Sequence, residues 1–345
     1  MKKKFLCIDG GGSRGIIPAT IMDCVFNDTG VHPREAFDLL AGTSTGGIIS
    51  IAYAFGVPTS VLVDLYLKKV REIFHENFLD RAQTGDEIFQ ANYKNRNFEI
   101  ILKNIFGEAT LGTLQSDNAF GGKDKDLMVC SFDLSPDVPN DDNKNYRPLV
   151  VHSNYIRDKD IKLYELALMT SAGPTYFPIY KKKYIDGGVA LNNPSMAAVS
   201  YAINNGKDEE KMSRYPDGVK KGLELGTNDI ELLSLSTGTS NKTRIEESVV
   251  KNGNWGKLKW LGYLPDLLTE ANMQSTKYYV KQILNDDQYC RIEAYFDKSP
   301  NPLLNNPKLD ISMDTKQENI LLALHEYAIE IYNKNKSRIL KFIEG

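Results

Sequence analysis

The sequence predicts an α/β fold in which helices cover both faces of a mostly parallel sheet. Short apolar runs typical of strands alternate along the chain with longer stretches whose apolar residues recur at helical spacing. This alternation is typical of parallel sheets, because each parallel connection must cross over one face of the sheet. With 345 residues, of which 41% are hydrophobic and 25% charged, the chain has the size and composition of a globular protein.

Strands are predicted at apolar runs that are bounded by polar or glycine-rich residues. In chain order they are Phe5–Asp9, Ala36–Ala41, Leu127–Asp133, Arg147–His152, Tyr184–Asp186 and Glu231–Ser236. The polar segment Pro136–Lys144 is predicted to be a solvated loop between the third and the fourth of these strands.

Helices are predicted where apolar periodicity follows a start signal. Pro58–Ser60 precedes an apolar stripe between Leu62 and Ile73. Thr315–Glu318 has the form of a capping box ahead of the apolar positions within Ile320–Ile331. A further helical run, Ile48–Phe55, follows a glycine-rich turn that is considered below.

The chain is predicted to form a single domain over residues 1–345, because no internal repeat and no linker-like segment interrupts it. The motifs described below fall mainly within residues 5–200. Helices in residues 255–345 are expected to pack on this core. The segment 81–125, rich in Asn, Gly and Gln, is predicted to be an insertion over one edge of the sheet.

Composition excludes several classes of partner. A net charge of −3 provides no basic footprint for nucleic acid, which is therefore not expected as a partner. The four cysteines, Cys7, Cys24, Cys130 and Cys290, show no metal-ligand spacing, so we expect buried free thiols, no metal site and a reducing compartment.

The basic start, MKKKFLCIDG, contains an apolar run much shorter than the core of a signal peptide. No stretch approaches the roughly 18 apolar residues that a membrane span requires. A cytoplasmic location is therefore expected.

A glycine loop follows the first predicted strand, in the sequence IDGGGSRGIIP at residues 8–18. Gly10, Gly12 and Gly15 spell G-x-G-x-x-G, the fingerprint of dinucleotide-binding folds. In those folds the second strand ends in an acidic residue that binds the ribose, whereas here Asp38 stands near the start of that strand. A dinucleotide cofactor is therefore disfavoured, and no cofactor is predicted.

A second glycine-rich turn, Gly42-Thr43-Ser44-Thr45-Gly46, has the form G-x-S-x-G. It lies between a predicted strand and a predicted helix, which is the context that a nucleophile elbow requires. The helix N-terminus would favour negative charge near Ser44. The pattern indicates a nucleophilic serine, and a purely structural turn is the alternative.

The base that would activate Ser44 is not an obvious histidine. Only His152 and His325 follow the serine at a useful distance; His152 has no evident acid partner and His325 lies within a predicted helix. Asp186 is the remaining candidate, because it ends a short strand and is followed by Gly187 and Gly188. An Asp-Gly hairpin turn is the alternative at this position.

An aspartate has an ordinary pKa of about 3.9 and is a weak base unless its surroundings raise that value. Partial burial of Asp186 against Ser44 would do so. The backbone N–H groups of Gly10, Gly11 and Gly12 are candidate donors to the tetrahedral oxyanion of acyl transfer. Arg14 would add positive charge for a phosphate-bearing substrate, or pair with a neighbouring acid.

Three motifs in this order, DGGGSRG (9–15), GTSTGG (42–47) and DGG (186–188), resemble the patatin-like phospholipase family. The similarity extends over most of the chain. Further stretches that resemble the family are FGEATLGTL (106–114), SAGPTYFP (171–178), LLSLSTGTS (232–240) and WGKLKW (255–260). The sequence departs from the family at Gly188, where plant members often have Ala, and at Ser236, where Gly is usual.

The resemblance implies a three-layer α/β/α sandwich and a Ser-Asp dyad that hydrolyses phospholipids or lysophospholipids without a metal or cofactor. It assigns Ser44 as nucleophile and Asp186 as base, with the backbone of Gly10, Gly11 and Gly12 as oxyanion donors. The motif-supporting residues are Arg14, Gly15, Gly42, Thr45, Gly46, Gly187 and Gly188.

Some bacterial members of this family are gated by cyclic nucleotides in antiviral defence. A cyclic-nucleotide activator is therefore among the expected partners, although the sequence assigns no residues to it and does not predict an oligomeric state. A non-enzymatic storage or binding protein and an acyltransferase are the alternative functions on the same scaffold.

A phospholipase must reach its substrate at a membrane surface. Residues 254–268, NWGKLKWLGYLPDLL, interleave aromatic residues and leucines with Lys257 and Lys259, which suits the interfacial region of a bilayer. The resulting expectation is peripheral contact with the inner membrane surface when the protein is active. The alternative is a helix that packs on the sheet through its tryptophans.

Overall fold

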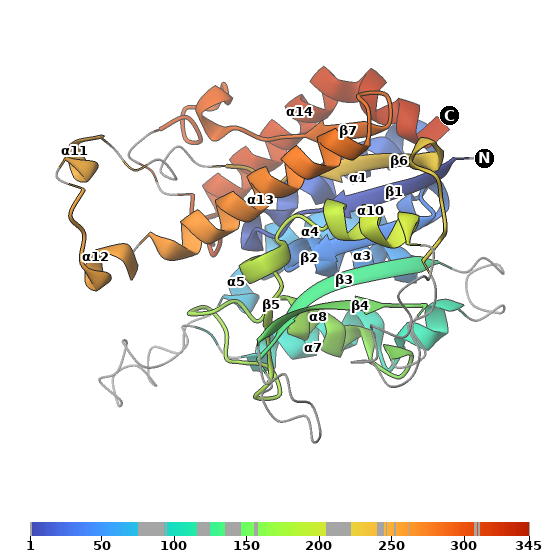
Figure 1. Cartoon of the computed structure of the whole chain (residues 1–345), viewed down its shortest axis with the longest axis horizontal. Coiled ribbons are helices and arrows are strands. Elements are labelled where there is room, and N and C mark those ends of the chain that lie inside the picture. The colour runs from blue at the N-terminus through green and yellow to red at the C-terminus, as the bar shows by residue number, and fades with distance from the viewer. Residues whose placement is uncertain are drawn as a thin grey trace.

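The computed structural model describes residues 2–74, 93, 95–115, 125–134, 146–154, 158–204, 222–239, 245, 247–251, 253–261, 263–306, 309 and 311–344. These residues form a seven-stranded sheet between two layers of helices (Figure 1). The expected three-layer α/β/α architecture is confirmed. The predicted loop Pro136–Lys144 lies outside the described residues.

The sheet has the order β4-β3-β2-β1-β6-β7, and β5 also pairs with β3. The strands are β1 (Lys3–Ile8), β2 (Leu39–Thr43), β3 (Asp126–Asp133), β4 (Arg147–His152), β5 (Tyr184–Asp186), β6 (Ile230–Leu235) and β7 (Tyr289–Ile292). The pairs among β3, β2, β1, β6 and β7 are parallel, whereas β4 and β5 run antiparallel to β3.

Alternate residues of the central strands enter two separate cores. In β1, Leu6 and Ile8 belong to the larger apolar cluster, whereas Phe5 and Cys7 belong to the smaller one on the other face. All of these side chains are fully buried, which explains the continuous apolar run of residues 5–8 in this strand.

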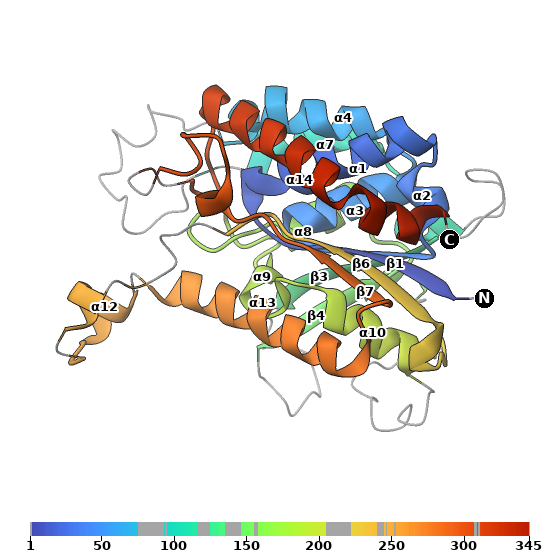
Figure 2. The ribbon, with the colours of Figure 1, turned by 90° about the horizontal axis from the view of Figure 1, so that it is seen from above.

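Helices divide between the two faces as Figure 2 shows. On one face lie α1 (Ile16–Thr29), α2 (Pro33–Ala36), α3 (Thr45–Phe55), α4 (Thr59–Asp64), α7 (Asn95–Phe106), α8 (Leu163–Thr170) and α14 (Glu318–Glu344). On the other lie α9 (Gly188–Leu191), α10 (Ser195–Ile203) and α13 (Leu264–Ile283). The short helices α11 (Glu247–Val250) and α12 (Lys257–Leu261) project away from the sheet in both views.

Several predicted boundaries differ from the structure by one to three residues, and two of the differences have a structural cause. The second strand begins at Leu39 instead of Ala36, because Pro33–Ala36 forms a helical turn that is capped by the His32 side chain. The C-terminal helix begins at Glu318 instead of following Thr315, and the Glu318 carboxylate pairs with Arg71 at 2.7 Å.

The described part of the predicted insertion, residues 95–115, contains α7 and a 3-10 turn. Phe98, Leu102 and Phe106 on one side of α7 are buried in the larger core, where the helix packs on α8. No helix in the described ranges is both long and apolar enough to cross a membrane.

Candidate active site

Ser44 occupies the sharp turn between β2, which ends at Thr43, and α3, which begins at Thr45. Its φ of 54° and ψ of −126° place a non-glycine residue in a strained region of backbone space. The surrounding hydrogen bonds hold this conformation. The Ser44 N–H donates to Oγ1 of Thr170 at 2.8 Å, and the Ser44 carbonyl accepts the N–H of Ile48 at 3.0 Å.

The turn requires glycine on both sides of the serine because other backbone segments pass very close. A Cβ at Gly42 would lie 2.1 Å from the carbonyl oxygen of Gly46, and a Cβ at Gly46 would lie 2.2 Å from that of Ile8. The G-x-S-x-G spacing is therefore a packing requirement of this strand–turn–helix unit.

Strand β3 places Asp186 near Ser44, because β2 and β5 both pair with β3. Thr43, the last residue of β2, lies opposite Cys130, whereas Asp186, the last residue of β5, lies opposite Ser131. Because β4 occupies the other edge of β3, strands β2 and β5 meet end to end along one edge. Ser44 and Asp186 therefore emerge at the same point of the sheet.

The Asp186 carboxylate is buried, with 8% of the residue exposed, and its Oδ1 accepts the N–H of Gly188 at 2.7 Å. Burial raises the pKa of Asp186 to about 6, although hydrogen bonds from the Ser44 side chain and from Gly188 act in the opposite direction. The hairpin alternative does not hold, since β5 leads through Gly187 into helix α9.

The glycine loop lies directly beside Ser44. A Cβ at Gly10 would lie 3.2 Å from the Cβ of Ser44. Gly12 has a φ of +58°, and a Cβ there would lie 2.0 Å from the carbonyl oxygen of Met313, so this position requires glycine.

The predicted set of three oxyanion donors must be corrected at Gly10. Its N–H already donates to the carbonyl of Asn192 at 3.1 Å and so is not available to a substrate. Within the described residues, the N–H groups of Gly11 and Gly12 donate no hydrogen bond to the protein. The N–H groups of Gly11 and Gly12 are therefore the ones that stay candidates for binding an oxyanion.

The supporting residues hold the loop and the elbow together. Arg14 is buried, and its Nε lies 3.4 Å from the carbonyl oxygen of Gly11. A Cβ at Gly15 would collide with the side chains of Thr45 and Tyr66, whose hydroxyls hydrogen-bond to each other. A Cβ at Gly187 would lie 2.4 Å from the Cys130 carbonyl oxygen.

The described histidines have other roles. Nδ1 of buried His152 accepts the N–H of Asn154 at 3.0 Å, and Nδ1 of His325 lies 2.9 Å from the hydroxyl of Thr20. His32 caps the start of α2. His75 lies outside the described residues.

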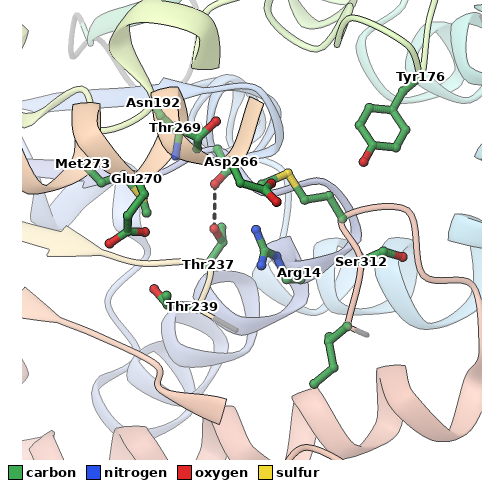
Figure 3. A pocket seen from close by; sticks show the side chains of 14 residues that line it. Arg14, Tyr176, Asn192, Thr237, Thr239, Asp266, Thr269, Glu270, Met273 and Ser312 are labelled. Carbon is green, nitrogen blue, oxygen red and sulfur yellow. Dashed lines mark hydrogen bonds between the residues drawn. The ribbon is translucent and has the colours of Figure 1, made fainter. Parts of the chain in front are cut away.

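Two cavities lined by described residues adjoin the glycine loop. The one that contains Ser44 has a volume of about 60 Å³, and Gly12, Ser13 and Thr45 also line it. Its remaining wall is mainly apolar and comprises Ile48, Leu65, Tyr66, Val70, Ile73, Phe74, Phe98, Ser171 and Phe177. The other cavity, of about 200 Å³, has a polar wall that includes Gly10, Arg14, Asn192 and Thr237 (Figure 3).

Sequence reasoning missed three residues that shape the site. Thr170 binds the Ser44 backbone, and the backbone carbonyl of Asn192 binds Gly10. Arg291 on β7 donates to Asp9, the first residue of the glycine motif, at 2.8 Å through Nη1 and also through Nη2. Thr170 directly precedes the stretch SAGPTYFP, and Asn192 follows the DGG motif by four residues, whereas no motif marks the short strand β7.

Comparison with known proteins identifies a family that this chain matches. The family model described as patatin-like phospholipase matches residues 6–199, which is more than half of the chain. The chain is 24% identical to Patatin-1-Kuras 2 of Solanum tuberosum over 321 residues, covering 84% of this chain and 77% of that protein. It is 25% identical to Patatin-T5 of the same species, covering 84% and 75% respectively.

A similar match, at 24% identity, is the Solanum tuberosum protein named probable inactive patatin-3-Kuras 1. Among solved structures, VipD from Legionella pneumophila matches with a TM-score of 0.42 and 12% identity, covering 97% of this chain and 67% of that one.

Proposed function

The chain belongs to the patatin-like phospholipase family, and we propose that it cleaves ester bonds of phospholipids or lysophospholipids through Ser44 and Asp186. Family membership supports lipid acyl hydrolase activity in general. The specific proposal rests on one observation: Ser44 and Asp186 lie at the same end of β2 and β5, and the Asp186 carboxylate is buried and has a raised pKa.

In the proposed reaction, the Ser44 hydroxyl attacks the ester carbonyl while the Asp186 carboxylate accepts its proton. The N–H groups of Gly11 and Gly12 stabilise the resulting oxyanion. When the intermediate collapses, protonated Asp186 returns the proton to the departing alcohol and the acyl group remains on Ser44. A water molecule, deprotonated by Asp186, then releases the fatty acid.

The apolar cavity beside Ser44 supports a lipid substrate. Its wall of aliphatic and aromatic side chains, including Ile48, Val70 and Phe177, suits the first part of an acyl chain. A fatty acyl ester would place its carbonyl at Ser44 with the alkyl chain directed into this cavity.

We further propose that an aromatic cluster on α12 and its flanks contacts the membrane surface. The rings of Trp255 and Trp260 lie 5.0 Å apart, and those of Trp255 and Tyr263 lie 5.1 Å apart. Nζ of Lys259 lies 4.5 Å from the centre of the Trp255 ring. The rings pack on one another, and α12, which carries Trp260, projects from the body of the protein (Figure 1). This arrangement favours an interfacial role over packing on the sheet.

The decisive experiment compares phospholipid hydrolysis by the wild type, Ser44→Ala and Asp186→Asn, with release of fatty acid as the readout. We expect both variants to lose nearly all activity. Robust hydrolysis by Ser44→Ala would overturn the mechanism, and an inactive wild type would favour a storage role. Adding an alcohol acceptor to the assay distinguishes hydrolysis from acyl transfer.

Gating by a cyclic nucleotide, and with it a role in antiviral defence, stays a prediction from family resemblance. The same assay tests gating when it is run with and without a panel of cyclic nucleotides. Activity that requires a nucleotide would support this prediction.

A further inference from the structure

The polar cavity beside the glycine loop is lined by side chains of both charges (Figure 3). Arg14 approaches from the loop, whereas Asp266 and Glu270 approach from α13. Gly10 also lines this cavity and lies against Ser44. A molecule bound here would therefore lie next to the proposed reaction centre.

Asp266 and Glu270 stand four residues apart and share one face of α13. Within the described part of the chain, neither carboxylate has a lysine or arginine at ion-pair distance. The hydrogen bond found for Glu270 comes from Gln274, at 2.6 Å. Two carboxylates that face a cavity and form no ion pair among the described residues attract a cation.

Asn192 provides a second observation that points to a ligand. Its residue is only 3% exposed, and its Nδ2 has no hydrogen-bond partner among the described residues. Its backbone is fixed, because its N–H donates to Oδ1 of Asn272 at 2.7 Å and its carbonyl accepts the N–H of Gly10. A buried amide donor without a partner is costly, and an oxygen acceptor from a ligand would relieve that cost.

We propose that this cavity selects a zwitterionic phospholipid headgroup with an amine, a step that rests on the proposed function. The phosphate would accept from Asn192 and Arg14, and the amine would lie against Asp266 and Glu270. A primary ammonium can hydrogen-bond to both carboxylates, whereas a quaternary ammonium prefers several aromatic rings. Tyr176 is the one aromatic residue among those described in the wall, so ethanolamine fits better than choline.

Binding tests the proposal independently of catalysis. Ser44→Ala protein is titrated calorimetrically with glycerophosphoethanolamine and with glycerophosphoglycerol, in EDTA so that no divalent cation occupies the acidic pair. We expect the ethanolamine compound to bind about fivefold more tightly, as a partly exposed ion pair allows. Adding Asp266→Asn and Glu270→Gln together should abolish that preference.

The matched control is Asp286→Asn, which removes an exposed negative charge just beyond the other end of α13. It should keep the preference, and thermal unfolding should show that all variants are folded. Equal binding of the two compounds, or a preference that survives in the double variant, would overturn the proposal.

Hydrolysis separates this proposal from the proposed function. In mixed micelles of matched acyl composition, wild-type kcat/KM should favour phosphatidylethanolamine over phosphatidylglycerol, and the double variant should hydrolyse both about equally. If the wild type hydrolysed both lipids equally well, headgroup selection would be contradicted and the proposed function would stand. A binding preference without hydrolysis of any lipid would contradict the proposed function but support the headgroup site.

Discussion

The Thr170 hydroxyl accepts the backbone N–H of Ser44 at 2.8 Å and donates to the carbonyl of Cys130 at 2.5 Å. One fully buried side chain thereby ties the strained serine turn to strand β3. The same strand holds β5 through Ser131, whose hydroxyl donates to the Ile185 carbonyl at 2.9 Å. Neighbouring residues of β3 therefore fix both halves of the proposed dyad.

Thr170→Val should lower kcat about tenfold with little change in KM. Valine keeps the shape of threonine but leaves the Ser44 N–H without its acceptor, a loss of about 1–3 kcal/mol. Steady-state kinetics on a soluble ester measures the effect. Thr170→Ser, which keeps the hydroxyl, should restore most of kcat, and equal losses in both variants would indicate a packing role.

Hydrolysis of a soluble, non-ionising ester should rise with pH and reach half of its maximum near pH 6. Asp186 must be deprotonated to accept the serine proton, and burial raises its pKa to about 6. A pH–rate profile of kcat/KM from pH 4 to 8 checks this. A flat profile over that range would contradict a carboxylate base.

Asp186→Asn should stabilise the protein above pH 6 while it removes activity. The folded-state pKa of Asp186 lies above its unfolded value, so the charged carboxylate opposes folding, and this cost grows as pH rises from about 4 to 6. We expect a gain of about 3 kcal/mol in the free energy of unfolding at pH 8. Urea denaturation at pH 8 and pH 4 measures it, and the gain should disappear at pH 4.

Arg291→Met should lower the free energy of unfolding by about 3 kcal/mol, because it leaves Asp9 as a buried charge without its partner. Chemical denaturation measures the loss. Lys277→Met is the matched control, since it breaks a partly exposed pair with Glu293 and should cost less than about 1 kcal/mol. Similar losses in the two variants would show that the buried ion pair contributes no more to the free energy of unfolding than the partly exposed one.

Trp260→Ala should weaken cosedimentation with phospholipid vesicles by several-fold, because Trp260 is 41% exposed within the projecting aromatic cluster. Tyr146→Ala, at an exposed aromatic residue outside that cluster, should bind like the wild type. Unchanged binding of the Trp260 variant would remove the cluster from the membrane-contact surface.

The central strands and the elbow could be predicted because their signals are local. β1, β3 and β6 each contain a short apolar run, and the close backbone approach at Gly42 and Gly46 leaves a spacing that is visible in the sequence. β7 was missed because its four residues include Arg291, whose role depends on Asp9 at the other end of the chain. A contact between residues so distant leaves no local pattern.

The sequence predicted which loop would supply the candidate oxyanion donors, but not which of its N–H groups are available. The occupation of the Gly10 N–H by the Asn192 carbonyl is a tertiary contact between segments far apart in the chain. The acidic pair on α13 was also missed, because Asp266 and Glu270 resemble any solvated helix face until the helix is placed over the glycine loop.

The end-to-end meeting of β2 and β5 along β3 makes the separation of Ser44 and Asp186 a matter of strand register. The long stretch of chain between them can change in length or content while the two functional groups keep their spacing, provided β3 and β5 stay paired. The same arrangement has a weak point. A slip of β5 by one residue would turn Asp186 to the opposite face of the sheet. The proposed site would then be inactive although the amino-acid sequence had not changed.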